Sequence, residues 1–236
     1  MALPPDTADA FVREVDENLR RDQTEEFLKR NLRWIVGGAL LFLAIVGGYF
    51  WWENHQKELA RDQSEQLSAA SQRVADGNVD GAVKAYIPLS DSSVDTTRAS
   101  AMFSRAALAI RKNDAKGAIA LYQQIEDDRG LAKPYHDMAL IRRTMLEYDS
   151  IKPDEVISRL SPLAKPGDPY FGTAGELTGM AMLAKGDKAG AGQLFARLAA
   201  DKTVPESIRS RAAQLAGSLG VDASASVIDS GASASQ

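Results

Sequence analysis

The sequence predicts an all-α protein in which a single N-terminal transmembrane helix is followed by a solenoid of about four helix pairs and a closing helix. Three observations predict it: an uncharged apolar run near the N-terminus, an alanine-rich remainder without the alternating pattern of strands, and a segment that recurs along that remainder. They divide the chain into four regions. We expect a charged helical leader over residues 1–33, a membrane span over 34–52, a repeat domain over 53–220 and a disordered tail over 221–236.

Composition excludes or disfavours several classes of function. The chain has 236 residues, no cysteine, only two histidines and a net charge of −4. Disulfides, thiolate metal sites and thiol nucleophiles are therefore excluded. Two histidines are also too few for most histidine-based metal sites, and they make a catalytic triad improbable. A negative net charge also repels the phosphate backbone of nucleic acids, so we expect no nucleic-acid partner. We predict no enzyme, no cofactor, and no catalytic or metal-binding residue.

The leader over residues 1–33 opens with Pro4 and Pro5 and then places Phe11, Val15 and Leu19 at helical spacing. Two interpretations stay open. The leader is either a solvated charged helix that runs into the membrane or a docking element for a cytoplasmic or membrane partner.

Residues 34–52 read WIVGGALLFLAIVGGYFWW, a run of 19 residues without a charge. As a helix this run is about 28 Å long, close to the ~30 Å hydrocarbon core of a bilayer. Its strongly apolar side chains favour insertion by about 3 to 5 kcal/mol, and aromatic residues stand at both ends, where their rings prefer the headgroup layer. The lipid bilayer is therefore an expected partner.

The basic residues around the run predict its orientation, because five of them precede it closely and only two follow. They are Arg20, Arg21, Lys29, Arg30 and Arg33 before the run, and Lys57 and Arg61 after it. The N-terminus should stay in the cytoplasm, with the repeat domain across the membrane. A cleaved signal peptide is the alternative, but 33 residues precede the run and Glu53-Asn54-His55-Gln56 follows it in place of a small-residue cleavage site, which favours a retained span.

Three later segments superimpose without gaps: DGNVDGAVKAYIPL, KNDAKGAIALYQQI and KGDKAGAGQLFARL. Their shared alanines, Ala82, Ala118 and Ala191, are 36 and then 73 residues apart, so we expect a weaker copy between the last two, with Val156 at the alanine position. Four and seven positions after this alanine, each copy has an aromatic or aliphatic residue. These pairs are Tyr86 and Leu89, Tyr122 and Ile125, Leu160 and Leu163, and Phe195 and Leu198.

A small residue stands twelve positions before each repeat alanine, at Ala70, Ala106 and Gly179, with Thr144 in the weak copy. Small side chains at both positions would let two antiparallel helices approach closely, while the aromatic or aliphatic pair fills the gap to the next repeat. The plan is therefore a helix, a tight turn and a second helix, repeated four times.

Turn residues fall where the first helix of a pair must stop, since glycine and asparagine tolerate the left-handed conformation of a helix end. They are Gly77-Asn78, Asn113-Asp114 and Gly186-Asp187. Prolines are expected in the first turns of later helices, at Pro134, Pro169 and Pro205. A closing helix should run from about Pro205 to Leu219, and the small polar residues that follow predict the disordered tail.

A period of this length, with small, alanine and aromatic positions in this order, resembles tetratricopeptide repeats and implies a right-handed solenoid. The order of parts, with FVREVDENLRRDQTEEFLKRNLRW running into the span, is similar to the YfgM family of ancillary SecYEG translocon subunits, also grouped with the TPR-like domain of cell division coordinators. The resemblance extends through residue 220. It implies a SecYEG-type translocon and a membrane-anchored periplasmic foldase as partners, unfolded secretory proteins as clients, and a single-pass position in a bacterial inner membrane.

The candidate binding residues are Arg98, Arg105, Tyr135 and Arg142, on first helices of their pairs, the helices that line a tetratricopeptide groove. These arginines, together with Arg143, are either a clamp on backbone carbonyls or acidic groups of a partner, or part of a solvated helix face. The same choice applies to the methionines, which form a soft binding stripe or fill the core. These are Met138, Met145, Met180 and Met182. His136 beside Asp137 predicts a surface or interhelix histidine, not a catalyst.

An open helical solenoid offers a concave surface that suits an extended peptide or a partner's helix better than a small substrate. We therefore expect a membrane-anchored periplasmic interaction protein that acts as a chaperone or adaptor for secreted proteins at the translocon. The alternative is an envelope scaffold that coordinates cell-wall synthesis or division complexes.

Overall fold

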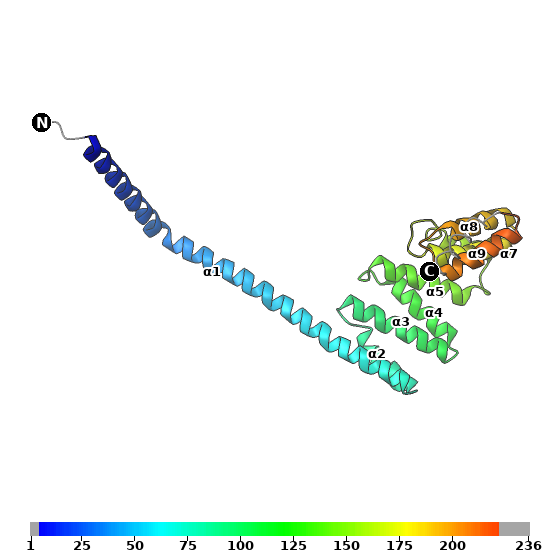
Figure 1. The fold of residues 1–236 in the computed structure, drawn as a ribbon. Coiled ribbons are helices and arrows are strands. Elements are labelled where there is room, and N and C mark those ends of the chain that lie inside the picture. Colours follow the sequence, from blue (N-terminus) through cyan, green and yellow to red (C-terminus); the bar gives the residue numbers. More distant parts are fainter. Residues whose placement is uncertain (1–4, 222–236) are drawn as a thin grey trace, which may run out of the picture. The chain divides into compact units, whose positions relative to one another are not determined.

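The computed structural model describes the backbone of residues 5–221 and the side chains of residues 31–221 other than those at positions 35 and 39. The described backbone contains nine helices and no strand (Figure 1). The all-α prediction is confirmed. The helices are α1 (Pro5–Ala75), α2 (Val79–Leu89), α3 (Asp95–Arg111), α4 (Ala115–Asp127), α5 (Lys133–Glu147), α6 (Pro153–Leu160), α7 (Phe171–Lys185), α8 (Lys188–Ala200) and α9 (Glu206–Ser218).

The first helix, α1, is continuous through the expected ends of the leader and of the span. From Asn31 it is long and apolar enough to cross a membrane, with a mean hydropathy of 1.8 over its most apolar window and none of that window buried. Large apolar side chains such as Trp34, Phe42 and Trp51 are more than 60% exposed. A water-soluble helix rarely leaves such a surface uncovered, so this part of α1 is a candidate membrane span. The leader's side chains before residue 31 and the expected tail from residue 222 lie outside the described residues.

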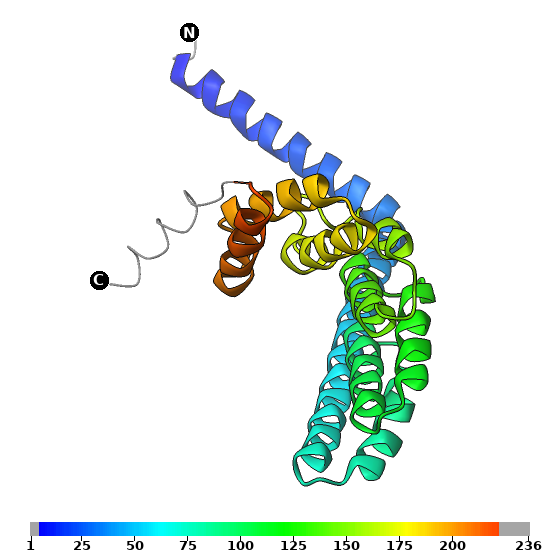
Figure 2. The ribbon, with the colours of Figure 1, turned by 90° about the vertical axis from the view of Figure 1, so that its right-hand side faces the viewer.

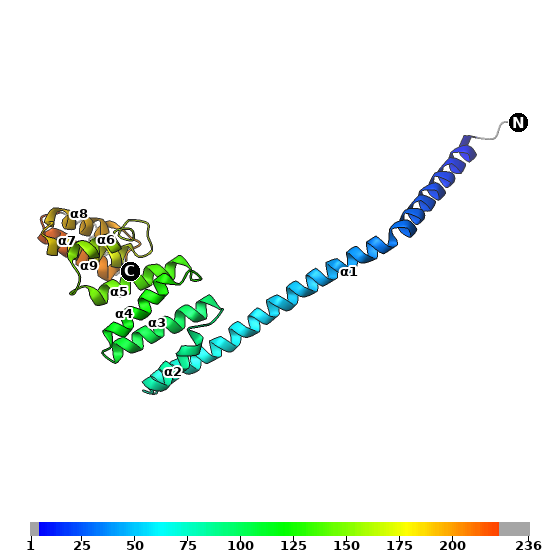
Figure 3. The same ribbon diagram turned by 180° about the vertical axis from the view of Figure 1, so that it is seen from behind.

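The chain divides at residue 61 into two units, and the second, from Asp62, contains the repeats. Its helices pair in order: the end of α1 with α2, α3 with α4, α5 with α6, and α7 with α8, after which α9 closes the series (Figure 2). From behind, α6, α7, α8 and α9 lie together (Figure 3). Four pairs and a closing helix over Glu206–Ser218 are as the sequence predicted.

Each repeat builds one small hydrophobic core around its aromatic or aliphatic pair. Tyr122 and Ile125 of α4, for example, are at most 1% exposed and share a cluster with Ala106 of α3 and Ala139 of α5. The repeat alanines are fully buried, and so are the small residues twelve positions earlier. Each second helix therefore packs on its own first helix and on the first helix of the next pair, as the spacing predicted.

Three of the four turns between paired helices share one arrangement. Gly77, Asn113 and Gly186 have φ values of 78°, 59° and 93°, the left-handed conformation predicted for them. A further feature of these three turns was not predicted: the N-cap side chain of α2, α4 and α8 accepts a hydrogen bond from a glycine N–H three residues on. These contacts are Asn78 with Gly81, Asp114 with Gly117, and Asp187 with Gly190.

Two of the three prolines start helices as expected, since Pro134 lies in the first turn of α5 and Pro205 is the N-cap of α9. The prediction for Pro169 was wrong, because α7 begins two residues later. The backbone N–H of Phe171 donates to the carbonyl of Asp168 at 3.0 Å, which closes a turn with Pro169 inside it.

Candidate functional site

Two adjoining cavities follow the first helices of the last repeats. One, of about 430 Å³, lies between α3, α5 and α7, and the other, of about 520 Å³, lies between α5, α7 and α9. Both are lined by Met145 and Thr173, so they form one continuous depression, which we call the α5–α7 groove. Its lining residues are Ile110, Tyr122, Met138, Ile141, Arg142, Met145, Leu146, Tyr170, Thr173, Glu176, Leu177, Met180, Arg211, Gln214, Leu215 and Ser218.

A third cavity, of about 450 Å³, lies between the end of α1 and α3. Its lining includes Val74 of α1 together with Ala107 and Arg111 of α3. Because Ile110 of α3 lines the α5–α7 groove, the two hollows lie on successive first helices. In a stack of helix pairs, the first helices line one continuous surface, and hollows between successive first helices are expected there.

Exposed apolar side chains gather in the α5–α7 groove. Beyond the candidate span, four large apolar residues of the described chain are exposed, and three of them, Ile110, Met145 and Met180, line this groove. Met138 lines it as well, whereas Met182 packs against the core of α7 to α9. Three of the four methionines therefore face a surface hollow, and Met182 alone is core filler. Methionine is a flexible, polarizable side chain that adapts to different apolar partners.

Arg142 is the predicted binding residue that lies in the groove. It is exposed on α5, and its guanidinium carbon lies 5.7 Å from the ring centroid of Phe103 on α3. The Phe103 ring in turn contacts the Tyr122 ring at 6.0 Å between centroids. A cation stacked on a ring face keeps its N–H edge free for another partner. Among the described residues, Arg142 has no ion pair or hydrogen bond.

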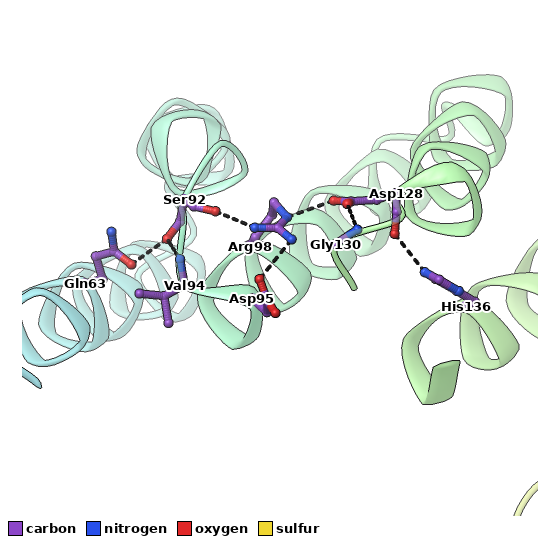
Figure 4. Close-up of polar contacts among 8 residues, drawn as sticks. All are labelled: Gln63, Ser92, Val94, Asp95, Arg98, Asp128, Gly130 and His136. Carbon is purple, nitrogen blue, oxygen red and sulfur yellow. Dashed lines mark hydrogen bonds and ion pairs between the residues drawn. The ribbon is translucent and has the colours of Figure 1, made fainter. Parts of the chain in front are cut away.

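Arg98 lies outside the groove, in a polar network that ties the start of α3 to the turn after α4 (Figure 4). Its guanidinium is 15% exposed and donates to the Asp128 carboxylate at 2.8 Å, to the Ser92 carbonyl at 2.7 Å and to Asp95 at 3.0 Å. Burial alone would raise the pKa of Asp128, but hydrogen bonds from the Gly130 N–H and Arg98 hold that pKa below its usual value. Arg98 is thus a structural cation with its donors in use.

Arg105 and Tyr135 are placed differently. Arg105 is five positions before Ile110, about 140° around α3, so it lies away from the α5–α7 groove. Tyr135 is seven residues before Arg142, on the same stripe of α5, and packs against the core around Tyr122. Of the four predicted residues, Arg142 alone lines the groove.

His136 and Asp137 do not pair with each other. The His136 Nε2 lies 2.9 Å from the carbonyl of Asp128, and the Asp137 carboxylate binds Lys133 at 2.5 Å. His136 is thus an interhelix histidine, as predicted. Among the described side chains, no group of three or more from histidine, cysteine, aspartate and glutamate could hold a metal ion.

Arg211, which no pattern in the sequence singled out, holds the groove's α9 wall to α7. Its guanidinium donates to both oxygens of the Glu176 carboxylate, at 2.5 and 2.8 Å. Because the two residues are 35 positions apart, no local sequence pattern predicts this ion pair. Glu176 is the only acidic side chain that lines the groove as described, and this contact neutralises it.

Comparison with known families agrees with this architecture. A family model described as a tetratricopeptide repeat-like domain matches residues 25–215, most of the chain. No curated protein and no solved structure matches the chain.

Proposed function

Because the chain belongs to the tetratricopeptide repeat-like domain family, we propose that it is a membrane-anchored interaction protein that holds another polypeptide in the α5–α7 groove. Domains of this kind are typically interaction modules. The observation that carries the proposal is the position of the exposed apolar side chains, since Ile110, Met145 and Met180 all line one groove. A contiguous apolar depression with polar edges is typical of a protein-binding surface.

The finer proposal concerns place and partners. The apolar stretch of α1 anchors the chain in a bacterial inner membrane with its N-terminus in the cytoplasm, and the repeats lie in the periplasm. The resemblance to the YfgM family supports a role as an ancillary translocon subunit, with unfolded secretory proteins as clients and a membrane-anchored foldase nearby. Anchoring raises the local concentration of the groove beside any channel in the same bilayer, so weak affinity for each client suffices.

Topology is the first test, and the absence of cysteine makes it simple. Single cysteines are introduced at Gln23 in the leader and at Gln123, an exposed position on α4. In cells with a permeable outer membrane, an impermeant maleimide should label Gln123→Cys, and should label Gln23→Cys only after lysis. The reverse pattern would place the repeats in the cytoplasm and remove secretion from the account.

A photoreactive residue at Met180 identifies the partner. Crosslinks to translocon subunits and newly exported chains are the expected products. Crosslinks to cell-wall synthases in their place would favour the alternative, an envelope scaffold that coordinates wall synthesis or division.

A further inference from the structure

We propose that the α5–α7 groove selects polypeptide segments in which apolar side chains are flanked by carboxylates, and that Arg142 is the residue that reads the carboxylate. This inference rests on the proposed function and adds the chemistry of the bound segment. The occupant is thus an acidic, apolar stretch of a partner chain, not a basic one.

The first argument is the charge of the lining. The chain as a whole carries a net charge of −4, but the α5–α7 groove is lined by Arg142, Arg211 and one acid, Glu176. Glu176 is bound to Arg211, so the charge left without a partner is that of Arg142. The neighbouring hollow between α1 and α3 adds Arg111, also exposed and without an ion pair among the described residues. A negative protein thus presents positive charge along this one face.

The second argument is the contrast with other arginines of the repeats. Arg98, Arg143 and Arg159 are held by carboxylates of Asp128, Glu126 and Glu147. Those cations join one helix to the next and have exposed fractions below 20%. Arg142, immediately before Arg143, differs from these three arginines. Its side chain is exposed, and no acidic side chain among the described residues forms an ion pair with it.

The third argument is that Arg142 is held in position. Stacking on Phe103, which is itself packed against Tyr122, restricts the guanidinium without using its N–H donors. Tyr122 is 1% exposed, so the support is part of the core. A prearranged guanidinium binds a carboxylate in a two-pronged geometry at low entropic cost, which a free surface lysine does not.

Apolar contacts complete the site. Met145 lies one helical turn after Arg142 on α5, and it is 51% exposed. An apolar side chain of the bound segment can therefore cover Met145 while a carboxylate near it in sequence reaches Arg142. Further along, Met180 and Leu177 of α7 offer a second apolar position.

The test uses the full chain in phosphatidylcholine nanodiscs, with empty nanodiscs as the blank. The probes are two short labelled peptides with the same two leucines, which are flanked by aspartates in one and by lysines in the other. Fluorescence anisotropy should show the aspartate peptide binding about five- to tenfold more tightly at low salt, with the difference shrinking at high salt.

Variants separate reading of charge from general stickiness. Arg142→Met keeps the apolar stem and should weaken the aspartate peptide about threefold without weakening the lysine peptide. Arg105→Met, an equal charge removal outside the α5–α7 groove, should change neither. Far-UV circular dichroism confirms that each variant is folded.

Two results overturn the inference in distinguishable ways. If both peptides bind equally, or if Arg142→Met weakens them equally, the groove binds polypeptide without reading charge and the proposed function survives. If neither peptide binds and a photoreactive residue at Met145 gives no crosslink in cells, the proposed function fails as well.

Discussion

Substituting Gly179 by alanine sets two effects of known size against each other. Gly179 lies in α7, where alanine would ordinarily stabilise a helix by about 1 kcal/mol. Here a Cβ atom would lie 2.7 Å from two carbon atoms of the Phe195 ring, which is fully buried. Comfortable carbon contacts are about 3.5–4.0 Å, so the ring must shift by roughly 1 Å within a packed core. Overpacking of this kind costs about 1–3 kcal/mol.

The clash should therefore outweigh the gain in helix propensity, and we expect Gly179→Ala to lower the free energy of unfolding by up to about 2 kcal/mol. For a domain of this size that corresponds to a fall in Tm of up to roughly 8 °C. All three tryptophans lie at or within the candidate span, so far-UV circular dichroism of the detergent-solubilised chain is the suitable assay.

Gly217→Ala is the matched control, since Gly217 lies in α9 with nothing within 4 Å of the added Cβ. It should be neutral or raise stability by about 0.5 kcal/mol. Phe195→Leu in the Gly179→Ala background should recover part of the loss, so that the two changes are not additive. If Gly179→Ala is as stable as Gly217→Ala, the close approach of α7 and α8 is refuted.

Three further predictions concern other described contacts. Gly117→Ala should cost about 1–2 kcal/mol in thermal unfolding, because its Cβ would lie 2.2 Å from the Asp114 carboxylate that caps α4; an unchanged Tm would contradict the cap. Asp128→Asn should lower stability at neutral pH by about 1–3 kcal/mol, because it weakens the bond to Arg98. The pKa of the Asp128 carboxyl is lowered from 3.8 in the folded chain, so the stabilisation from its ionised form is fully present above pH 3.8 and is lost as the pH falls through the folded-state pKa. The denaturation midpoint of Asp128→Asn should therefore change less with pH below 3.8 than that of the parent chain. Parallel pH curves for the two proteins would contradict this. Thr178→Val should be neutral or stabilise by up to about 1 kcal/mol in urea unfolding, because the buried Thr178 hydroxyl has no hydrogen-bond partner among the described residues; a loss above about 1 kcal/mol would contradict this.

Much of the fold was predictable because the residues that pack between helices recur at a fixed spacing in the sequence. Alanine and glycine recur where helices touch, and an aromatic or aliphatic pair recurs where each core must be filled. Gly179 and Phe195, two positions that the repeat spacing alone identified, pack directly against each other. Left-handed turns such as that at Asn113 followed from residue type.

Other features were not predictable because they depend on contacts between distant positions. Arg98 and Arg142 both stand on first helices, but only the fold shows that Asp128, 30 positions away, satisfies the first. Arg105 has the right residue type but lies outside the α5–α7 groove, which a sequence without a known groove direction does not reveal. The Arg211 pair with Glu176, 35 positions apart, was missed for the same reason.

The most direct test of a polypeptide-binding groove compares two photoreactive positions in living cells. One replaces Met145, in the groove, and the other replaces Gln123, exposed on α4 and outside every cavity described above. Binding in the groove predicts strong protein crosslinks from Met145 and few from Gln123 at equal expression. Equal yields from both positions, or a higher yield from Gln123, would contradict it.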